Sequence, residues 1–473
     1  MRRAISVCAL FLAMVQATWA HAQTPTTSPA AEQQAKAWLQ VFNSGDRDEF
    51  KAYLEKNRPS DVPHLGGLMD FRQRTGGFEL KKTEESTPTK YVALLKEKGS
   101  DQFARLTIEV EPEEPHRISK FDLWAVPTPV EFALPRETEG DAVASLRKYL
   151  ETETAAGHFS GAALVAKNGT IVFEQAYGMA DREEKIANQI NTKFRIGSMN
   201  KMITAVSTMQ LVQAGKIQLS DTVGKYLPEY PNKDVASKVK IENLLTHTGG
   251  TGDIFGPEFE AHRLALRTLQ DYVNLYGKRG LEFEPGSRWQ YSNYGFILLG
   301  AIIENVTGQS YYDYVREHVY KLASMTSTDS LPETERVPDR SVGYMKRGPG
   351  PWQPNTDTLP WRGTSAGGGY STVEDLYRFA IGLEQHKLLD AAHVSTLMSG
   401  KVHTPNGGKY AYGFAEDNGG GMACVGHGGG APGMNGELKI CPTAGYIIVV
   451  LANMDPPAAQ RVATFVAERL PLK

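Results

Sequence analysis

Cysteine is scarce in this chain, with three residues among 473. Neither Cys424 nor Cys441 belongs to a His/Cys cluster at metal-ligand spacing, which argues against a zinc site. Cys8 lies in an apolar N-terminal run, whereas Cys424 and Cys441 flank a glycine-rich turn. The second pair either forms a disulfide across neighbouring antiparallel strands or remains two separate buried thiols.

A strong charge of one sign is also absent. Lys and Arg number 51 against 54 Asp and Glu, for a net charge of −3, and no long Lys/Arg run occurs. This balance argues against nucleic acid or an anionic membrane as a partner. Hydrophobic residues at 41% and charged residues at 22% are typical of a chain with a sizeable core. At roughly 150 residues per domain, the length predicts two or three domains.

Long apolar runs are missing beyond the N-terminus. The longest later run, 446–451, is short enough for a buried strand and far below the roughly 18 residues of a membrane span. At the start, Arg2 and Arg3 precede the apolar run 4–19 and the small-residue pattern Ala20-His21-Ala22. This pattern predicts a signal peptide over 1–22 and a periplasmic or secreted protein without a stable membrane anchor. An uncleaved N-terminal anchor is the alternative.

Residues 23–127 are predicted to form an accessory domain. Apolar residues recur at helical spacing across 30–57, which predicts helix, turn and helix. From residue 78 the period changes to two, and four alternating segments predict an antiparallel meander: 78–86, 89–99, 101–111 and 117–126. In pattern this unit resembles NTF2-like cone-shaped α+β domains, and it contains no catalytic motif. A proline-containing linker is expected over 128–142.

Residues 143–473 are predicted to form the larger domain. Two strand-like runs meet at Asn168-Gly169, a strong hairpin signal. Three more such runs lie near the C-terminus and precede a closing helix, over 424–430, 436–442 and 446–454. Strands at both ends of a largely helical segment predict one antiparallel sheet flanked by helices, an α+β fold.

Ser198 and Lys201 lie at the start of a predicted apolar helix. Residues three apart share a helix face, so the Lys201 amine can reach the Ser198 hydroxyl. A serine becomes a good nucleophile when a neighbour takes its proton, and burial lowers the pKa of a lysine enough for this role. The same spacing occurs at Ser145/Lys148 and at Ser237/Lys240. The alternative is a capping serine at a buried helix start.

Two further motifs have residue types that suit catalysis. Tyr291 and Asn293 precede another apolar helix; tyrosine can relay protons, and asparagine offers both a donor and an acceptor. The alternative is an interface tyrosine. His427 begins the run His427-Gly428-Gly429-Gly430, where glycines permit close approach to a backbone. A glycine-rich hairpin turn with an incidental histidine is the alternative there.

The order Ser-x-x-Lys, Tyr-x-Asn, His-x-Gly resembles the serine β-lactamase-like hydrolases over 143–473. These comprise class C β-lactamases, DD-carboxypeptidases of the penicillin-binding type, D-aminopeptidases and related esterases. Four further segments are similar to the family's: SGAALVAKNGTIVFEQAYG, LLTHTGGTGD, GTSAGGGYSTVEDLYRF and GHGGGAPGMNGELKI.

The resemblance implies a role for each motif residue. Ser198 is the implied acyl-forming nucleophile, and Lys201 and Tyr291 share general acid/base duty. Asn293, His427, Gly429 and Gly430 are the implied substrate-binding residues: Asn293 binds the substrate amide or orients Lys201, and His427 contacts a carboxylate or the leaving group. The backbone N–H groups of Ser198 and Gly430 form the oxyanion hole.

His427 and Gly428 replace the Lys and Thr of the family's Lys-Thr-Gly. This departure removes an ammonium and a hydroxyl, and favours broad esterase or peptidase action. No metal or organic cofactor is implied, and the expected partner is a small-molecule or peptide substrate. The alternative function is a catalytically silent penicillin-binding-like or cell-wall-binding protein.

Several other residues are interpreted as structural. His247 is expected to be a hydrogen-bonded, non-catalytic histidine, and Asp253 and Glu437 are expected to be structural or rim charges. Trp352 and Trp361 either form a wall of the cleft or pack against the protein interior.

Overall fold

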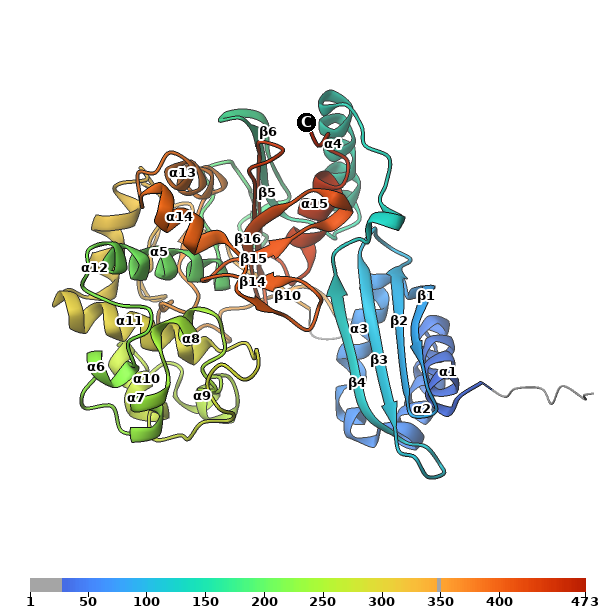
Figure 1. Cartoon of the computed structure of the whole chain (residues 1–473). Coiled ribbons are helices and arrows are strands. Elements are labelled where there is room, and N and C mark those ends of the chain that lie inside the picture. Colours follow the sequence, from blue (N-terminus) through green and yellow to red (C-terminus); the bar gives the residue numbers. More distant parts are fainter. Residues whose placement is uncertain (1–27, 347–349) are drawn as a thin grey trace, which may run out of the picture.

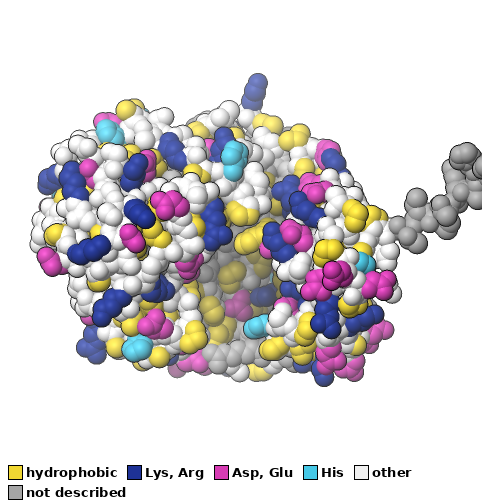
Figure 2. Space-filling view, turned by 60° about the horizontal axis from the view of Figure 1, so that its bottom comes forward, with side chains coloured by type: hydrophobic (Ala, Val, Ile, Leu, Met, Phe, Trp, Pro, Cys, Tyr) yellow, Lys and Arg dark blue, Asp and Glu magenta, His cyan; other side chains and the backbone are white. Residues whose placement is uncertain are grey.

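The computed structural model describes residues 28–346 and 350–473 (Figure 1). The predicted signal peptide, 1–22, lies outside the described residues. An N-terminal unit of helices and a small sheet stands beside a larger unit built on a long sheet (Figure 1). On one face, the molecule is hollowed between these two parts (Figure 2).

The N-terminal unit packs helices against a four-stranded antiparallel sheet of order β1-β2-β3-β4. Its strands follow the predicted meander: β1 (Phe78–Ser86), β2 (Lys90–Glu97), β3 (Phe103–Val110) and β4 (Ile118–Val126). Its helical elements are α1 (Ala30–Ser44), α2 (Arg47–Asn57), η1 (Pro59–His64) and α3 (Leu65–Thr75). The sequence did not predict α3, because Gly66 and Gly67 in its first turn are poor helix formers.

The N-terminal unit has a hydrophobic core of its own. Trp38 and Phe42 stack with ring centroids 4.8 Å apart, and Phe42 also packs against Phe50 and Phe78. Gly45 ends α1 in the left-handed conformation at φ 71°, and the Asp46 side chain accepts from the first turn of α2. These residues account for the helix–turn–helix predicted over 30–57. Resemblance to an NTF2-like cone stays a prediction.

The connection between the units is short and partly helical. It contains η2 (Val130–Phe132), and α4 (Glu139–Ala155) begins within the predicted linker, 128–142, and continues into the larger unit. Two ion pairs join the units: Arg461 to Glu97 at 2.7 Å and Arg469 to Asp101 at 2.9 Å. All four of these side chains are largely buried, so charged groups with little exposure to solvent form part of the interface between the units.

The larger unit is built on an eight-stranded antiparallel sheet of order β13-β14-β15-β16-β17-β18-β5-β6. Pairing of β18 with β5 joins the two ends of this unit, as the sequence predicts. The strands are β5 (Gly161–Lys167), β6 (Thr170–Tyr177), β13 (Val402–His403), β14 (Lys409–Tyr410), β15 (Ala415–Asp417), β16 (Cys424–Ala431), β17 (Met434–Cys441) and β18 (Tyr446–Ala452). The short strands β13–β15 were not predicted, because two or three residues show no alternation.

Helices cover both faces of the long sheet (Figure 1). Along β18, Ile447 and Val449 belong to one hydrophobic cluster and Ile448 and Val450 to the other, so the strand is apolar throughout. α4 and α15 (Ala458–Ala467) pack on the second cluster. On the first cluster pack α5 (Asn200–Gln213), α11 (Asn293–Thr307) and α13 (Val373–Glu384).

Short elements complete the larger unit. The helical ones are η3 (Gly197–Met199), α6 (Val223–Tyr226), α7 (Lys233–Lys238), α8 (Ile241–Leu245), α9 (Pro257–His262), α10 (Leu269–Tyr276), α12 (Tyr311–Val315), η4 (Arg316–Tyr320), α14 (Ala391–Met398) and η5 (Gly419–Gly421). The strands are β7 (Met179–Asp181), β8 (Ile186–Ala187), β9 (Phe194–Arg195), β10 (Tyr344–Met345), β11 (Gln353–Pro354) and β12 (Tyr370–Ser371). Among the described residues, no helix has the length and apolar character needed to cross a membrane.

Cys424 and Cys441 form a disulfide between β16 and β17. The alternative left open by the sequence, two separate thiols, is therefore wrong. The neighbouring pair Val425 and Ile440 is in register, which places the two cysteines opposite each other on adjacent strands.

Candidate active site

Ser198 and Lys201 meet at the start of α5. Ser198 lies in η3, and Lys201 lies in the first turn of the helix, whose face carries both side chains. The Lys201 Nζ atom is 3.2 Å from the Ser198 Oγ atom. Ser198 itself is partly exposed, so its hydroxyl can be approached from outside.

Lys201 is completely buried, with an exposed fraction of 0%. Its Nζ donates to Asn293 Oδ1 at 2.7 Å and to the Ala366 carbonyl. Burial lowers the pKa of Lys201 to about 7, against the opposing effect of the Asp253 charge. Near neutral pH, a large fraction of this amine is therefore uncharged and able to accept a proton.

Tyr291 lies beside both Lys201 and Ser198. Lys201 Nζ is 4.7 Å from the centroid of the Tyr291 ring. Burial raises the pKa of the Tyr291 phenol, and a hydrogen bond with the Ser198 side chain acts in the opposite direction. The phenol is thus protonated at neutral pH and suits the role of a proton donor more than that of a resting base.

Asn293 is held in place by Asp253, a residue that the sequence assigned to structure or the rim. Asn293 Nδ2 donates to Asp253 Oδ2 and the Asn293 backbone N–H donates to Oδ1, each at 3.1 Å. Because Nδ2 faces the carboxylate, Oδ1 is turned to Lys201. Asp253 therefore orients the amide that binds the lysine. In the sequence it is the last residue of the segment LLTHTGGTGD, which by itself gives no sign of this contact.

The glycines of β16 allow this strand to pass very close to the nucleophile. A Cβ on Gly429 would lie 2.0 Å from the Ile196 carbonyl oxygen, closer than any side chain can be accommodated. A Cβ on Gly197 would lie 3.1 Å from Gly430 N. The Gly430 N–H is thus placed beside the residue that precedes Ser198. The 427–430 run is part of a strand, which excludes the alternative of a hairpin turn.

His427 lies in this strand, but both its ring nitrogens are engaged within the protein. Nε2 is 2.9 Å from the Tyr410 hydroxyl, and Nδ1 contacts the Gly428 carbonyl. Burial, and then the charge of Lys201, lowers the pKa of His427 to about 4. The residue is therefore neutral, whereas the family's usual lysine would supply an ammonium.

His247 also belongs to the site. Its ring centroid lies 4.3 Å from that of Tyr291, and its Nε2 is 3.1 Å from the Tyr410 hydroxyl. The sequence predicted a hydrogen-bonded histidine, which the structure confirms, but gave no sign of Tyr410 or of the contact with Tyr291.

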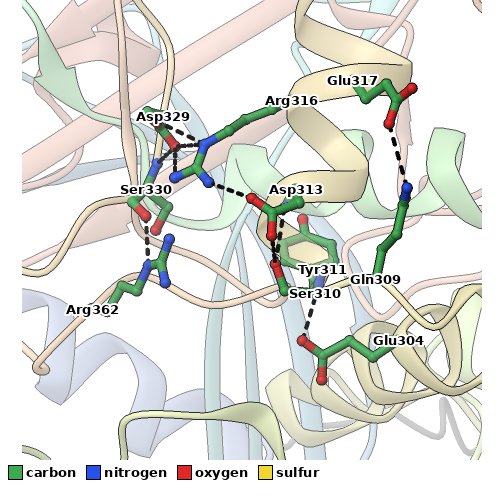
Figure 3. A network of polar contacts seen from close by, with 10 residues as sticks. All are labelled: Glu304, Gln309, Ser310, Tyr311, Asp313, Arg316, Glu317, Asp329, Ser330 and Arg362. Atoms are coloured by element: carbon green, nitrogen blue, oxygen red, sulfur yellow. Dashed lines mark hydrogen bonds and ion pairs between the residues drawn. The ribbon is translucent and has the colours of Figure 1, made fainter.

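Buried hydrogen bonds from Tyr311 hold α5 in position. The Tyr311 hydroxyl lies 2.7 Å from Thr204 Oγ1 and accepts from Asn200 Nδ2 at 3.2 Å. Asn200 also donates to the Thr364 carbonyl, which ties α5 to the turn that carries Ala366. Figure 3 shows the polar network that anchors Tyr311 and α12, formed by Glu304, Gln309, Ser310, Asp313, Arg316, Glu317, Asp329, Ser330 and Arg362.

Glu437 lies away from the nucleophile, on the other face of the sheet. It pairs in register with Gly428, and its carboxylate is 4.0 Å from the Lys439 amine. Trp352 lies beside Arg182 and Lys346, and Trp361 beside Arg267, in ring–cation contacts. Within 28–346 and 350–473, no cluster of His, Cys, Asp and Glu side chains could hold a metal ion.

Comparison with known proteins finds relatives of the larger unit. A profile of the family described as Beta-lactamase matches residues 146–472. The chain is similar to the Bacillus subtilis protein PbpX, named as a penicillin-binding protein, with 31% identity over 302 residues, 63% of this chain and 71% of that protein.

Two solved structures share the fold. A penicillin binding protein from Bacillus halodurans has a TM-score of 0.61 and 33% identity, over 66% of this chain and 98% of that one. A D-stereospecific amidohydrolase from Streptomyces sp. has a TM-score of 0.59 and 26% identity, over 68% of this chain and 97% of that one.

Proposed function

The chain belongs to the beta-lactamase family of serine hydrolases, and on that premise we propose that it cleaves an ester or an amide through an acyl-enzyme on Ser198. The observation that carries the proposal is the position of the Lys201 amine. It lies 3.2 Å from the Ser198 hydroxyl in a fully buried setting that favours its neutral, proton-accepting form.

In acylation, Ser198 Oγ attacks the substrate carbonyl carbon while its proton passes to Lys201 Nζ. A new C–O bond forms, and the carbonyl oxygen becomes an oxyanion. We assign the stabilisation of that charge to the backbone N–H groups of Ser198 and Gly430. Asn293 keeps Lys201 in place through the 2.7 Å hydrogen bond to its amine.

The leaving group then departs with a proton. Tyr291, whose phenol stays protonated, donates to the leaving oxygen or nitrogen and regains its proton from the Lys201 ammonium. In deacylation, a water molecule attacks the acyl carbon and gives its proton to the same pair. Ser198 recovers its own proton as the acid product is released.

The substrate is proposed to be an ester or an amide of the D-amino-acid type without an obligatory carboxylate next to His427. The neutral imidazole of His427 supports this choice, because it offers no cation for a carboxylate partner. The similarity to the D-stereospecific amidohydrolase supports an amide as the substrate.

Export to the periplasm or the medium is part of the proposal. The leader pattern of residues 2–22 supports it, and so does the Cys424–Cys441 disulfide, since such bonds persist in oxidising compartments. The unit over 23–127 is proposed to be an NTF2-like accessory domain. Sequencing of the mature N-terminus tests export, with Gln23 expected as the first residue.

The test of the catalytic proposal combines labelling with turnover. A fluorescent phosphonate is expected to label Ser198, and Ser198→Ala is expected to lose both the label and the hydrolysis of p-nitrophenyl esters. Full hydrolysis by Ser198→Ala would overturn the proposal. An unlabelled, inactive wild-type protein would instead favour a catalytically silent binding protein, the alternative function.

A further inference from the structure

Tyr410 connects the two histidines of the site. Its hydroxyl lies 3.1 Å from His247 Nε2 and 2.9 Å from His427 Nε2. All three side chains are buried, with Tyr410 at an exposed fraction of 3%. A hydroxyl has one proton, so it donates to one histidine and accepts from the other. The direction decides which tautomer each histidine adopts.

At one end of this series of hydrogen bonds, a backbone donor determines the tautomer of His247. The Ser292 N–H donates to His247 Nδ1 at 3.1 Å, so Nδ1 has no proton. A neutral His247 therefore carries its proton on Nε2 and donates it to the Tyr410 oxygen. Burial keeps His247 neutral by lowering its pKa well below the usual value.

A backbone acceptor lies at the other end. His427 Nδ1 faces the Gly428 carbonyl, which can only accept, so this contact favours the tautomer with the proton on Nδ1. Nε2 is then free to accept the Tyr410 proton. Both ends impose the same direction: Ser292 N–H to His247, His247 to Tyr410, Tyr410 to His427, and His427 to the Gly428 carbonyl.

We propose that His247 and Tyr410 are positioning residues that hold His427 as the Nδ1–H tautomer and thereby fix β16 relative to Tyr291. The inference rests on the proposed function for its effect on turnover. His427 then holds in position the strand that supplies the Gly430 N–H. Both of its ring nitrogens are hydrogen-bonded within the protein, so neither is available to bind substrate. This replaces the role that the family resemblance implies, a direct contact with substrate.

This series of hydrogen bonds also disfavours protonation of His427 to its charged form. Protonation of Nε2 would place two N–H donors against the single Tyr410 oxygen and leave the phenol proton without its acceptor. The other titratable groups around His427 are the Lys201 amine and the phenol of Tyr291, whose ring lies 6.4 Å away. A charged Lys201 adds repulsion in the same direction.

The first test reads the tautomers directly, without reference to activity. In protein labelled with ¹³C and ¹⁵N at histidine, the ¹³Cδ2 and ring ¹⁵N shifts are expected to show His427 as Nδ1–H and His247 as Nε2–H. The two resonances are assigned by their loss in His427→Gln and His247→Asn. A wild-type protein with His427 as the Nε2–H tautomer would overturn the proposal, whatever the outcome for Ser198.

The second test removes the central hydroxyl. Tyr410→Phe is expected to shift both histidine resonances and to lower kcat about tenfold, the scale of a buried hydrogen bond, with little change in KM. Tyr412→Phe, two residues along the same segment, is the matched control and is expected to retain wild-type shifts and kcat. Wild-type histidine shifts in Tyr410→Phe would contradict the role of Tyr410.

A third variant covers the case in which Tyr410→Phe fails to fold. His247→Asn keeps an acceptor for the Ser292 N–H but lacks the donor to Tyr410. It is expected to leave His427 in a mixture of tautomers, visible in the same spectra, and to lower kcat more than it raises KM. A retained Nδ1–H tautomer would show that Tyr410 and His247 do not set it.

Discussion

Asp253 accepts two hydrogen bonds from Asn293, one from its backbone N–H and one from its side-chain amide, each at 3.1 Å. This pairing leaves only the Asn293 oxygen to face Lys201. The carboxylate thus acts on Lys201 in two ways: it orients the amide, and its charge raises the pKa of the amine against the larger effect of burial.

Replacing Asp253 is expected to change both rate and pH dependence. Asp253→Asn removes a charge that raises the pKa of Lys201, so the acid limb of kcat/KM should move to lower pH. The amide of Asn293 also loses its fixed orientation, so the plateau should fall about tenfold or more. Full pH–rate profiles of an ester substrate measure both effects. Glu229→Gln, at an exposed site, is the control; an acid limb shifted to higher pH in Asp253→Asn would contradict this account.

The wild-type pH profile is expected to rise through about pH 7. The base must be the neutral amine of Lys201, and its pKa is lowered to about 7 by burial. Activity is therefore lost as the pH falls below that value. Measurement of kcat/KM between about pH 5 and pH 9 tests this, because that range includes both protonation states of Lys201. A flat profile would exclude Lys201 as the base.

Lys201 is also expected to make stability depend on pH. Its pKa in the folded protein lies below that in the unfolded chain, so the unfolded state binds more protons between about pH 7 and 10. The free energy of unfolding contributed by this group therefore rises with pH across that window. Lys201→Met should abolish turnover and flatten the slope of Tm against pH; an unchanged slope would contradict a strongly shifted lysine.

Gly429→Ala is expected to damage the site through the backbone. The added Cβ would meet the Ile196 carbonyl oxygen at 2.0 Å, so β16 must move away from η3. Tm should fall, and kcat should drop about a hundredfold because the Gly430 N–H moves with the strand. Gly67→Ala in α3 is the control: apart from its chain neighbours and the backbone of its own helix, no atom lies within 4 Å of its Cβ, and its Tm should stay level or rise. Equal behaviour of the two variants would contradict the close approach of β16.

Removing the disulfide is expected to cost stability more than activity. The cross-link closes a loop with a sequence separation of 17, for which chain entropy predicts about 3 kcal/mol. The double variant Cys424→Ala/Cys441→Ala should melt at lower temperature yet turn over substrate at 25 °C. Denaturant titration and a thiol assay under non-reducing conditions check this. Two free thiols in the unfolded wild-type protein would show that the bond does not form.

Local patterns predicted much of the fold. Alternation in 78–126 predicted the meander, and Asn168-Gly169 predicted the β5–β6 hairpin, with both residues at positive φ. Hydrophobic residues that recur every two or 3.6 positions can be recognised from a short stretch of sequence, without knowledge of distant contacts. The strands β13–β15 are too short to show such a pattern, and they are ordered by pairing with one another and, through β15, with β16.

The proximity of Ser198 and Lys201 is predicted by the sequence alone, because three residues along a helix return a side chain to the same face. Selecting that pair over Ser145/Lys148 and Ser237/Lys240 took the surrounding motifs and the apolar helix that buries the lysine. Tertiary structure decided the rest. Asp253 meets Asn293 across 40 residues, and Tyr410 meets His247 across 163. Proton positions and pKa values depend on such distant contacts, which no local spacing records.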